Sequence, residues 1–379
     1  MKICYWGTYD RGYPRNQTII RGLRANGVEV AELNEPLWKN TKEKLERASS
    51  WWKDPAFLLR WAALYFKLAF RLLREKNVDF IFVGYAGHFD IFPARLLSAL
   101  TGKPLVFDAF LSIYEAFTSD RSTVAPGSLR ARALYLVDKY SCLLSDVVLL
   151  DTDEHIKYFC STFGLPREKF VRSFIGASED AFPPLPAAPQ EGRFLVLHFG
   201  RYIPLHGLKH IVRAAKELEA HGDIHFRFIG SGEELEATLR LAKELGLKRA
   251  EFIEFIKPAE LVKHIAQADV CLGIFGETEK AARVIPNKVY EAMAMKRPVL
   301  TGRSPAAAEL LTDQEDCLLC GMADPAAIAA ALLRLKSEPG LRLKIAENGR
   351  RLFEKKACGK VLGREILEML GARFPGAKD

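Results

Sequence analysis

The feature that most constrains this sequence is a series of short apolar runs, each followed by a helical pattern, that occurs twice. In the first half the runs are KICYW (2–6), VEVAEL (28–33), DFIFVG (79–84), PLVFDA (104–109) and DVVLLD (146–151). In the second half they are FLVLHFG (194–200), HFRFIG (225–230), EFIEF (251–255), VCLGIFG (270–276) and RPVLTG (297–302). Such runs are typical of parallel strands that are buried on both faces. Because helical patterns separate them, the sequence predicts two doubly wound parallel sheets of the α/β class.

A proline-rich segment separates the two series. Residues 180–192, DAFPPLPAAPQEG, contain four prolines, which cannot join a central strand and disfavour helix in the residues before them. We therefore expect an N-terminal domain over 1–179, a linker over 180–192 and a C-terminal domain over 193–357. Open parallel sheets bind ligands at the carboxyl ends of their strands, so loops of both domains should line a cleft between them.

Composition excludes several classes of protein. With 49% hydrophobic and 27% charged residues, the chain of 379 residues has the balance of a folded protein and not of a disordered one. The seven cysteines lack the regular spacing of a disulfide framework, and the opening MKICYWGTYDRGYPRN lacks the apolar core of a secretory signal. We therefore expect a cytoplasmic protein. Its net charge of +8 alone would allow nucleic acid as a partner, but no motif for it is present, so none is expected.

One segment, FLLRWAALYFKLAFRLL over 57–73, is apolar enough to raise the question of a membrane span. Arg60, Lys67 and Arg71 share one helical face, and charges at this density argue against a span. Together with Trp51 and Trp52, the mixture of aromatic and basic side chains suggests instead that residues 51–74 contact an anionic membrane surface. The alternative is a core helix that packs on the first sheet.

Two stretches of the second half suggest an anion site. In HFGRYIPLHGLKH, Gly200 and Arg201 follow a strand and Gly207 opens a helix, so backbone N–H groups and a guanidinium could bind phosphate oxygens. Further on, a polar loop leads to a helix that should start near Pro286. The basic residues around that helix start are Lys280, Arg283 and Lys288.

Asn287 and Glu291 share a face of this second helix, and so do Lys288 and Glu291. A carboxylate in an otherwise apolar segment needs a partner. Either Glu291 forms an internal ion pair with Lys288, or its carboxylate accepts two hydrogen bonds from a ribose diol while the helix start holds phosphates.

A cysteine pair, a glycine pair and five histidines are expected to have structural roles. Cys317-x-x-Cys320 has no second ligand pair for zinc, so both cysteines are expected to be buried on a strand. Gly230-Ser231-Gly232 is half of a dinucleotide fingerprint, because Leu235 stands at the third glycine position, and this disfavours an NAD enzyme. Five histidines without ligand spacing are expected at the surface or in turns: His198, His210, His221, His225 and His264.

The chain resembles family 4 (group 1) glycosyltransferases of the GT-B fold in four stretches and in their order. These stretches are GRYIPLHG, FIGSGEELEATLRLAKELGL, IAQADVCLGIF and PNKVYEAMAMKRPVLTG. The resemblance covers about residues 194–302 closely. It implies two facing Rossmann-like domains, a nucleotide-sugar donor in the second and an acceptor in the first. It also implies transfer with retention of configuration and without a metal or other cofactor. In this family the final helix, here over 358–379, commonly crosses back to the first domain.

The resemblance also assigns roles to individual residues. Arg201 matches the arginine that contacts the donor diphosphate, and Glu291 matches the glutamate that holds the ribose. Three positions depart from the family: Arg283 replaces a glutamate eight residues before Glu291, His206 replaces a lysine, and Asp108 stands near the place of a first-domain histidine. Lys288 or Lys280 could supply the missing cation. The expected donor site is Gly200, Arg201, His206, Gly230, Lys280, Arg283, Asn287, Lys288 and Glu291. The expected catalytic residues are Arg201, Lys288 and Asp108.

The resemblance thus predicts a retaining enzyme that moves a sugar from a nucleotide-diphosphate donor, expected to be UDP- or GDP-linked, to a glycan or lipid-linked acceptor. Surface polysaccharide or glycolipid biosynthesis, on the inner face of the cytoplasmic membrane, is the expected setting. Two alternatives remain open from the residues: a nucleotide-sugar epimerase or hydrolase of the same fold, and a non-catalytic binding or scaffold subunit.

Overall fold

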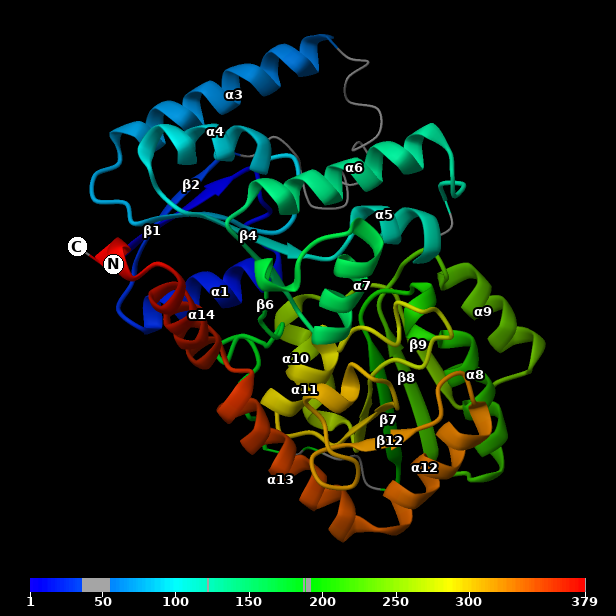
Figure 1. Cartoon of the computed structure of the whole chain (residues 1–379). Helices are drawn as coiled ribbons and strands as arrows, with labels where there is room; N and C mark the ends of the chain where they lie inside the picture. Colours follow the sequence, from blue (N-terminus) through cyan, green and yellow to red (C-terminus); the bar gives the residue numbers. More distant parts are fainter. Residues whose placement is uncertain (36–54, 121–122, 187, 189–191, 379) are drawn as a thin grey trace. The chain divides into compact units, whose positions relative to one another are not determined.

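The computed structural model describes residues 1–35, 55–120, 123–186, 188 and 192–378 (Figure 1). The chain divides into two compact units. Unit 1 comprises Met1–Phe174 together with Gly359–Asp379, and unit 2 comprises Ile175–Cys358. Each unit contains one six-stranded sheet with helices on both faces, and every pairing within the two sheets is parallel. The predicted α/β class with two doubly wound sheets is therefore confirmed.

In unit 1 the strand order is β2-β1-β3-β4-β5-β6. The strands are β1 (Lys2–Gly7), β2 (Glu29–Asn34), β3 (Phe80–Val83), β4 (Leu105–Phe110), β5 (Val147–Leu150) and β6 (Phe170–Arg172). The helices are α1 (Pro14–Ala25), α3 (Pro55–Arg74), α4 (Ile91–Thr101), α5 (Ile113–Glu115), α6 (Leu129–Leu144), α7 (Asp153–Phe163) and α14 (Gly359–Arg373).

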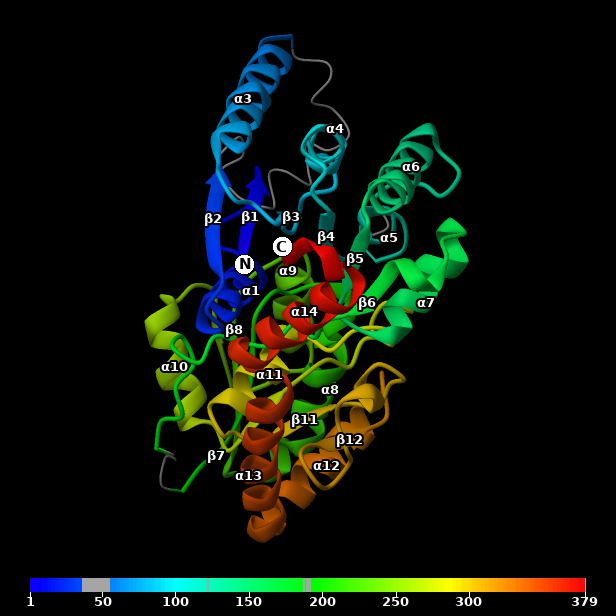
Figure 2. The same cartoon turned by 60° about the vertical axis from the view of Figure 1, so that its left-hand side comes forward.

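Side chains of β1 alternate between the two faces of this sheet, as a strand requires. Cys4 and Trp6 pack with residues of α3, α4, α6 and α7, whereas Ile3 and Tyr5 pack with residues of α1 and α14. Figure 2 shows the same division, with α1 and α14 on the face opposite to α3, α4 and α6. The central strands are buried on both sides, which explains their continuously apolar sequences.

In unit 2 the strand order is β12-β11-β10-β7-β8-β9. The strands are β7 (Phe194–Phe199), β8 (Ile224–Ile229), β9 (Ala250–Ile253), β10 (Val270–Leu272), β11 (Val299–Gly302) and β12 (Leu318–Cys320). The helices are α8 (Leu208–Glu217), α9 (Leu235–Glu244), α10 (Pro258–Gln267), α11 (Asn287–Ala294), α12 (Pro325–Ser337) and α13 (Pro339–Lys356). The chain order reverses beside β7, which places the loops after β7 and β10 next to each other at the carboxyl edge.

The division between the units differs from the predicted boundaries. The chain passes into unit 2 after Phe174, so the proline-rich segment 180–192 belongs to unit 2 instead of joining the two units. Hydrogen bonds explain this: the Nη2 atom of Arg297 donates to the carbonyl of Leu185 (3.2 Å), and the amide of Ala188 donates to the carbonyl of Ala266 (3.1 Å). Prolines keep the segment out of the sheet, but the carbonyl of Leu185 and the amide of Ala188 still form hydrogen bonds to unit 2.

The final helix α14 belongs to unit 1, where it packs along α1. The two backbones approach so closely that a Cβ atom on Gly22 would lie 2.0 Å from the carbonyl oxygen of Gly359. Glycine is required there because any side chain would overlap the neighbouring helix.

Each of the ten predicted apolar runs overlaps a strand. Cys317 and Cys320 are both buried, as expected, with Cys320 on β12 and Cys317 directly before it. None of the apolar runs predicts β6, which has three residues and a single buried side chain, that of Phe170. A strand so short carries no apolar periodicity, so only its pairing with β5 identifies it.

The segment 57–73 forms most of α3, and none of the described helices is long and apolar enough to cross a bilayer. Its buried side chains, Tyr65, Leu68 and Leu72, pack on the sheet of unit 1. Trp51 and Trp52, which the membrane hypothesis also used, lie outside the described residues.

Candidate functional site

The loops at the carboxyl edge of the unit 2 sheet are tied together by backbone contacts. The amide of Tyr202 after β7 donates to the carbonyl of Ser231 after β8 (3.0 Å), and the amide of Phe275 after β10 donates to the carbonyl of His206 (3.1 Å). Gly230 has a φ of +134°, and a Cβ atom there would lie 1.8 Å from the carbonyl oxygen of Gly200. The structure therefore brings the predicted residues Gly200, His206 and Gly230 to one rigid edge.

Lys288, in the first turn of α11, reaches into this edge and is almost completely buried. Its Nζ atom lies 2.8 Å from Nε2 of His198 and 3.2 Å from Nδ1 of His206. A lysine ammonium group only donates hydrogen bonds, so both ring nitrogens accept and both imidazoles are neutral. The two histidines thus hold the ammonium group in place without neutralising its charge.

Lys288 also lies against the loop that follows β7. A Cβ atom on Gly200 would lie 3.5 Å from Cε and 3.7 Å from Nζ of Lys288. The next residue, Arg201, is exposed at the end of the same strand. A residue with a guanidinium group and a buried ammonium group therefore lie at the same strand end, an arrangement that suits an anion with several oxygens.

Burial controls the protonation of this cluster. It lowers the pKa of His198 and His206 well below the ordinary value, and the charge of Lys288 lowers them further. Burial also lowers the pKa of Lys288 to about 7, although the negative charge of Glu291 opposes this shift. For Glu291 burial raises the pKa to about 7, opposed by Lys288. The charge of the cluster therefore changes near neutral pH.

Glu291 lies one helical turn after Lys288 and is partly buried. Among the described residues, no side chain donates a hydrogen bond to its carboxylate. The predicted ion pair between Lys288 and Glu291 is not formed, because Lys288 bonds to the two histidines instead. The alternative, a carboxylate that accepts hydrogen bonds from a ligand, is compatible with this geometry.

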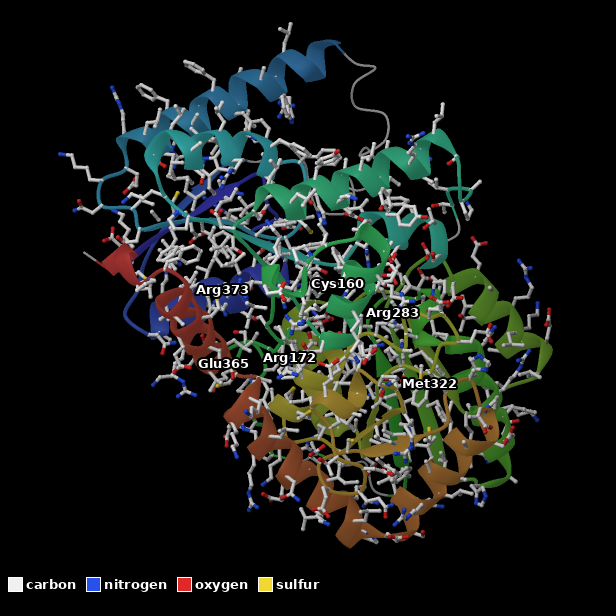
Figure 3. The ribbon with its side chains drawn as sticks, viewed as in Figure 1. Cys160, Arg172, Arg283, Met322, Glu365 and Arg373 are labelled. Atoms are coloured by element: carbon white, nitrogen blue, oxygen red, sulfur yellow. The ribbon has the colours of Figure 1, made fainter. Side chains whose placement is uncertain are left out.

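The loop that leads into α11 carries Lys280 and Arg283, and Arg283 is labelled in Figure 3. Ala281 and Val284 of this loop pack with Leu205 and other apolar side chains, and this packing holds the loop against the strand ends. Lys280 is buried, and Arg283 forms an ion pair with Glu279 on the loop itself. Asn287 begins α11 at the end of this loop.

The structure corrects the role expected for Asp108. This residue lies on β4 of unit 1 and is completely buried, and the Nε atom of Arg15 donates to both of its oxygens (2.8 and 2.7 Å). Arg15 also donates to the carbonyls of Ser173 and Phe174. Asp108 therefore joins α1 and β4 as half of an enclosed ion pair, which leaves its carboxylate no access to a reacting group.

The expectation that His198 and His210 lie at the surface or in turns is wrong, because both are buried. His198 stands near the end of β7, in a strand that is otherwise apolar. A single polar residue in such a strand needs a buried partner, and this was the signal for its role. The sequence could not name the partner, since Lys288 lies ninety positions further along the chain.

Within the described residues, neither a metal-ligand cluster nor a pocket indicates a second functional centre. No group of three or more His, Cys, Asp or Glu side chains there could hold a metal ion. A pocket of about 560 Å³ lies before β10 and β11, at the amino edge of the unit 2 sheet, and Asp269, Arg297 and Arg342 are among its lining residues. None of the predicted site residues lines it, and Arg297 donates to three backbone carbonyls, which indicates a structural role.

Unit 2 is similar in sequence to a described family of proteins. Residues 193–338 match the family model "Glycosyl transferases group 1". The chain is 27% identical over 177 residues to the lipopolysaccharide core biosynthesis glycosyltransferase LpsD of Rhizobium meliloti, covering 46% of this chain and 49% of LpsD. It is 28% identical over 242 residues to the GDP-mannose-dependent alpha-(1-6)-phosphatidylinositol monomannoside mannosyltransferase of Mycolicibacterium smegmatis, covering 60% and 63%. The chain thus spans about half to two thirds of these relatives.

Solved structures resemble the whole chain. Sucrose-phosphate synthase from Thermosynechococcus elongatus superposes with a TM-score of 0.73 at 15% identity, over 99% of both chains. Anabaena HepE in complex with UDP and glucose gives a TM-score of 0.71 at 15% identity, over 98% of this chain and 100% of HepE. Likeness at this identity shows the fold alone, and it confirms the predicted GT-B fold class.

Proposed function

We propose, from the match of residues 193–338 to the group 1 glycosyl transferases, that the chain is a retaining enzyme using a nucleotide-diphosphate sugar as donor. The observation that carries the proposal is the cluster of Lys288, His198 and His206 beside Gly200 and Arg201. It places two cationic side chains at the carboxyl end of β7, where open parallel sheets bind their ligands.

In this proposal Lys288 takes the part that a lysine at position 206 would have in the family. His206 cannot supply a charge because its buried imidazole is neutral, but its ring holds the Nζ atom of Lys288 at 3.2 Å. The cation thus comes from α11 to the place beside the loop after β7. Arg201 binds the same diphosphate from the exposed side through its forked N–H groups.

The reaction requires stabilisation of the negative charge that develops on the leaving diphosphate. As the bond between the sugar and the β-phosphate breaks, negative charge grows on the diphosphate, and Arg201, Lys288 and the first amides of α11 stabilise it. With no resident metal or cofactor in the proposal, the fixed cations carry this task. The partly buried carboxylate of Glu291 binds the ribose diol of the nucleotide once it is ionised.

We further assign the acceptor to a glycan or a lipid-linked glycan, in surface polysaccharide or glycolipid biosynthesis on the cytoplasmic side of a membrane. Support comes from two relatives whose names refer to lipopolysaccharide core and to a phosphatidylinositol mannoside. The proposed nucleotide of the donor is UDP or GDP. The name of one relative specifies GDP-mannose, and the HepE structure holds UDP. An anionic membrane surface is the proposed partner of residues 51–74.

Thermal unfolding with UDP, GDP, ADP and CMP tests the donor site. We expect one nucleoside diphosphate to stabilise the protein, by about 2.7 kcal/mol at one hundred times its Kd. Lys288→Met keeps the length of the side chain but removes the charge, so it should abolish this stabilisation. Lys263→Met, on the exposed side of α10, is the matched control and should leave it unchanged.

Acceptor-dependent release of the nucleoside diphosphate tests the reaction. Arg201→Ala alters an exposed side chain and should lower kcat by about ten- to a thousandfold, the range for loss of one transition-state donor. Sugar release without an acceptor would indicate a hydrolase. Nucleotide binding without any turnover would indicate a binding subunit, and no stabilisation by any nucleotide would refute the donor site.

A further inference from the structure

Exposed large apolar side chains are concentrated on three helices of unit 1. In the described part of the chain, fourteen large hydrophobic residues are exposed, and eleven of them lie on α3, α4 and α6. Folded proteins scatter such residues singly, whereas a concentration of them marks a surface that contacts another apolar phase.

These residues follow helical spacing. On α3 they are Leu59, Phe66, Phe70 and Leu73, with exposed fractions between 47% and 77%. The successive spacings of seven, four and three residues keep them on one side of the helix. They therefore form a stripe along α3.

The same spacings occur again on α6, at Leu129, Leu136, Tyr140 and Leu143. On α4 the exposed residues recur every four positions and include Leu96 (63% exposed) and Leu100 (67%). Each of the three helices thus carries an exposed apolar stripe.

A second apolar side of each helix packs on the sheet. Leu68 of α3, Leu97 of α4 and Leu134 of α6 are all buried. A surface helix of a globular protein is normally polar on the side away from the core. A helix that is apolar on two sides is expected to contact the protein core on one side and a second apolar environment on the other.

The three stripes lie on one surface. α4 contacts both α3 and α6, and Figures 1 and 2 show all three helices on the same face of the unit 1 sheet, away from α1 and α14. We call this surface, formed by the outward sides of α3, α4 and α6, the apolar face.

The three helices of the apolar face carry an excess of basic residues. The three helices contain eight lysine or arginine residues and a single acidic residue, Asp138, which is completely buried. Glu35 at the end of β2 pairs with Lys67 and Arg71, and Asp146 pairs with Arg95. The other five basic residues are Arg60, Arg74, Arg130, Arg132 and Lys139.

We infer that the apolar face docks on a membrane surface that contains anionic lipid, with its apolar side chains in the interface and its basic residues at the phosphate headgroups. This deepens the proposed function, because a protein held there would meet a lipid-linked acceptor, and it extends the membrane contact beyond residues 51–74 to α4 and α6. A second protein with a plain apolar surface would not explain why the three helices carry eight basic residues and a single, buried acidic one.

Vesicle flotation of the full chain tests this inference, with phosphatidylcholine vesicles that do or do not contain phosphatidylglycerol. The wild type should float with the anionic vesicles, less so at high salt. The double variant Leu96→Glu/Leu136→Glu lies outside residues 51–74 and changes only exposed positions. It should weaken binding by about tenfold or more per substitution, since each leucine loses its transfer into the interface.

Leu343→Glu on α13 of unit 2 is the matched control, because Leu343 is 61% exposed and Leu96 is 63% exposed. It should float like the wild type. The inference is overturned if the wild type does not float, or if the double variant floats equally well. It is also overturned if the wild type forms dimers that the double variant dissociates while no vesicle binds.

Nucleotide stabilisation of the double variant separates this inference from the proposed function. Retained stabilisation shows that the variant is folded and that only the docking surface was changed. If the wild type floats but no nucleotide stabilises it, the donor site fails and the docking surface stands.

Discussion

At the scale of single residues, the site depends on a lysine that is held by two neutral histidines. The Nζ atom of Lys288 is 2.8 Å from His198 and 3.2 Å from His206, and burial brings the pKa of Lys288 to about 7. Donor binding should therefore depend on pH near neutrality, a range in which the charge of an exposed lysine does not change.

We predict that nucleoside diphosphate affinity falls as the pH rises from 7 to 9. The diphosphate binds the protonated amine, and above a pKa of about 7 the protonated fraction decreases up to tenfold per pH unit. Lys288→Arg keeps its charge throughout this range, so its Kd should change little. Isothermal titration at several pH values measures the effect.

Glu291→Gln is the control for this pH dependence, because it removes the other group with a pKa of about 7. The decrease in affinity with pH should persist in that variant, although its absolute affinity is lower. A wild-type Kd that does not change between pH 7 and 9 would contradict the role given to Lys288.

At the scale of elements, the close approach of α1 and α14 leaves no room for a side chain between the two helices. A Cβ atom on Gly363 of α14 would lie 2.2 Å from the backbone carbonyl group of Gly22 on α1. Ile366 and Leu370 of α14 complete one apolar core of unit 1. The C-terminal helix is therefore part of the fold of unit 1.

We predict that Gly363→Ala lowers the free energy of unfolding by about 1–3 kcal/mol, the range for overpacking, although alanine is the better helix former. Gly340→Ala on α13 is the control, because a Cβ atom there meets nothing within 4 Å. That substitution should be neutral or slightly stabilising. Urea unfolding measures both, and equal stabilities would show that the two helices can separate without loss.

At the scale of the whole molecule, the two proposed ligands belong to different units. The residues of the donor site all lie in unit 2, and the apolar face lies in unit 1. Each unit has its own sheet and its own hydrophobic cores.

We predict two separate patterns of amide hydrogen exchange. The nucleoside diphosphate should slow exchange in the loops after β7 and β8 and at the start of α11, while anionic vesicles should slow it on α3, α4 and α6. The double variant Leu96→Glu/Leu136→Glu should lose only the second pattern. Protection of the apolar face by the nucleotide alone would contradict this assignment.

Much of the fold was predictable from the sequence because strands buried on both faces must be apolar throughout. Of the twelve strands in the described residues, ten overlap the apolar runs, and β12 contains Cys320, which was expected on a strand. The sequence does not predict β6, because only its pairing with β5 identifies it. The boundary at 180–192 was misplaced because proline composition indicates the absence of sheet and helix, but not which unit forms hydrogen bonds with the segment.

Local apolar periodicity and turn residues are enough to predict the class of fold, the two series of strands and the loops that carry Arg201 and Lys288. Which side chains meet follows from the tertiary structure alone. It joined Lys288 to His198 and His206 and enclosed Asp108 with Arg15. It also combined three helical stripes into one apolar face. The physical reason is that burial and electrostatic partners depend on contacts between distant segments, which no local pattern records.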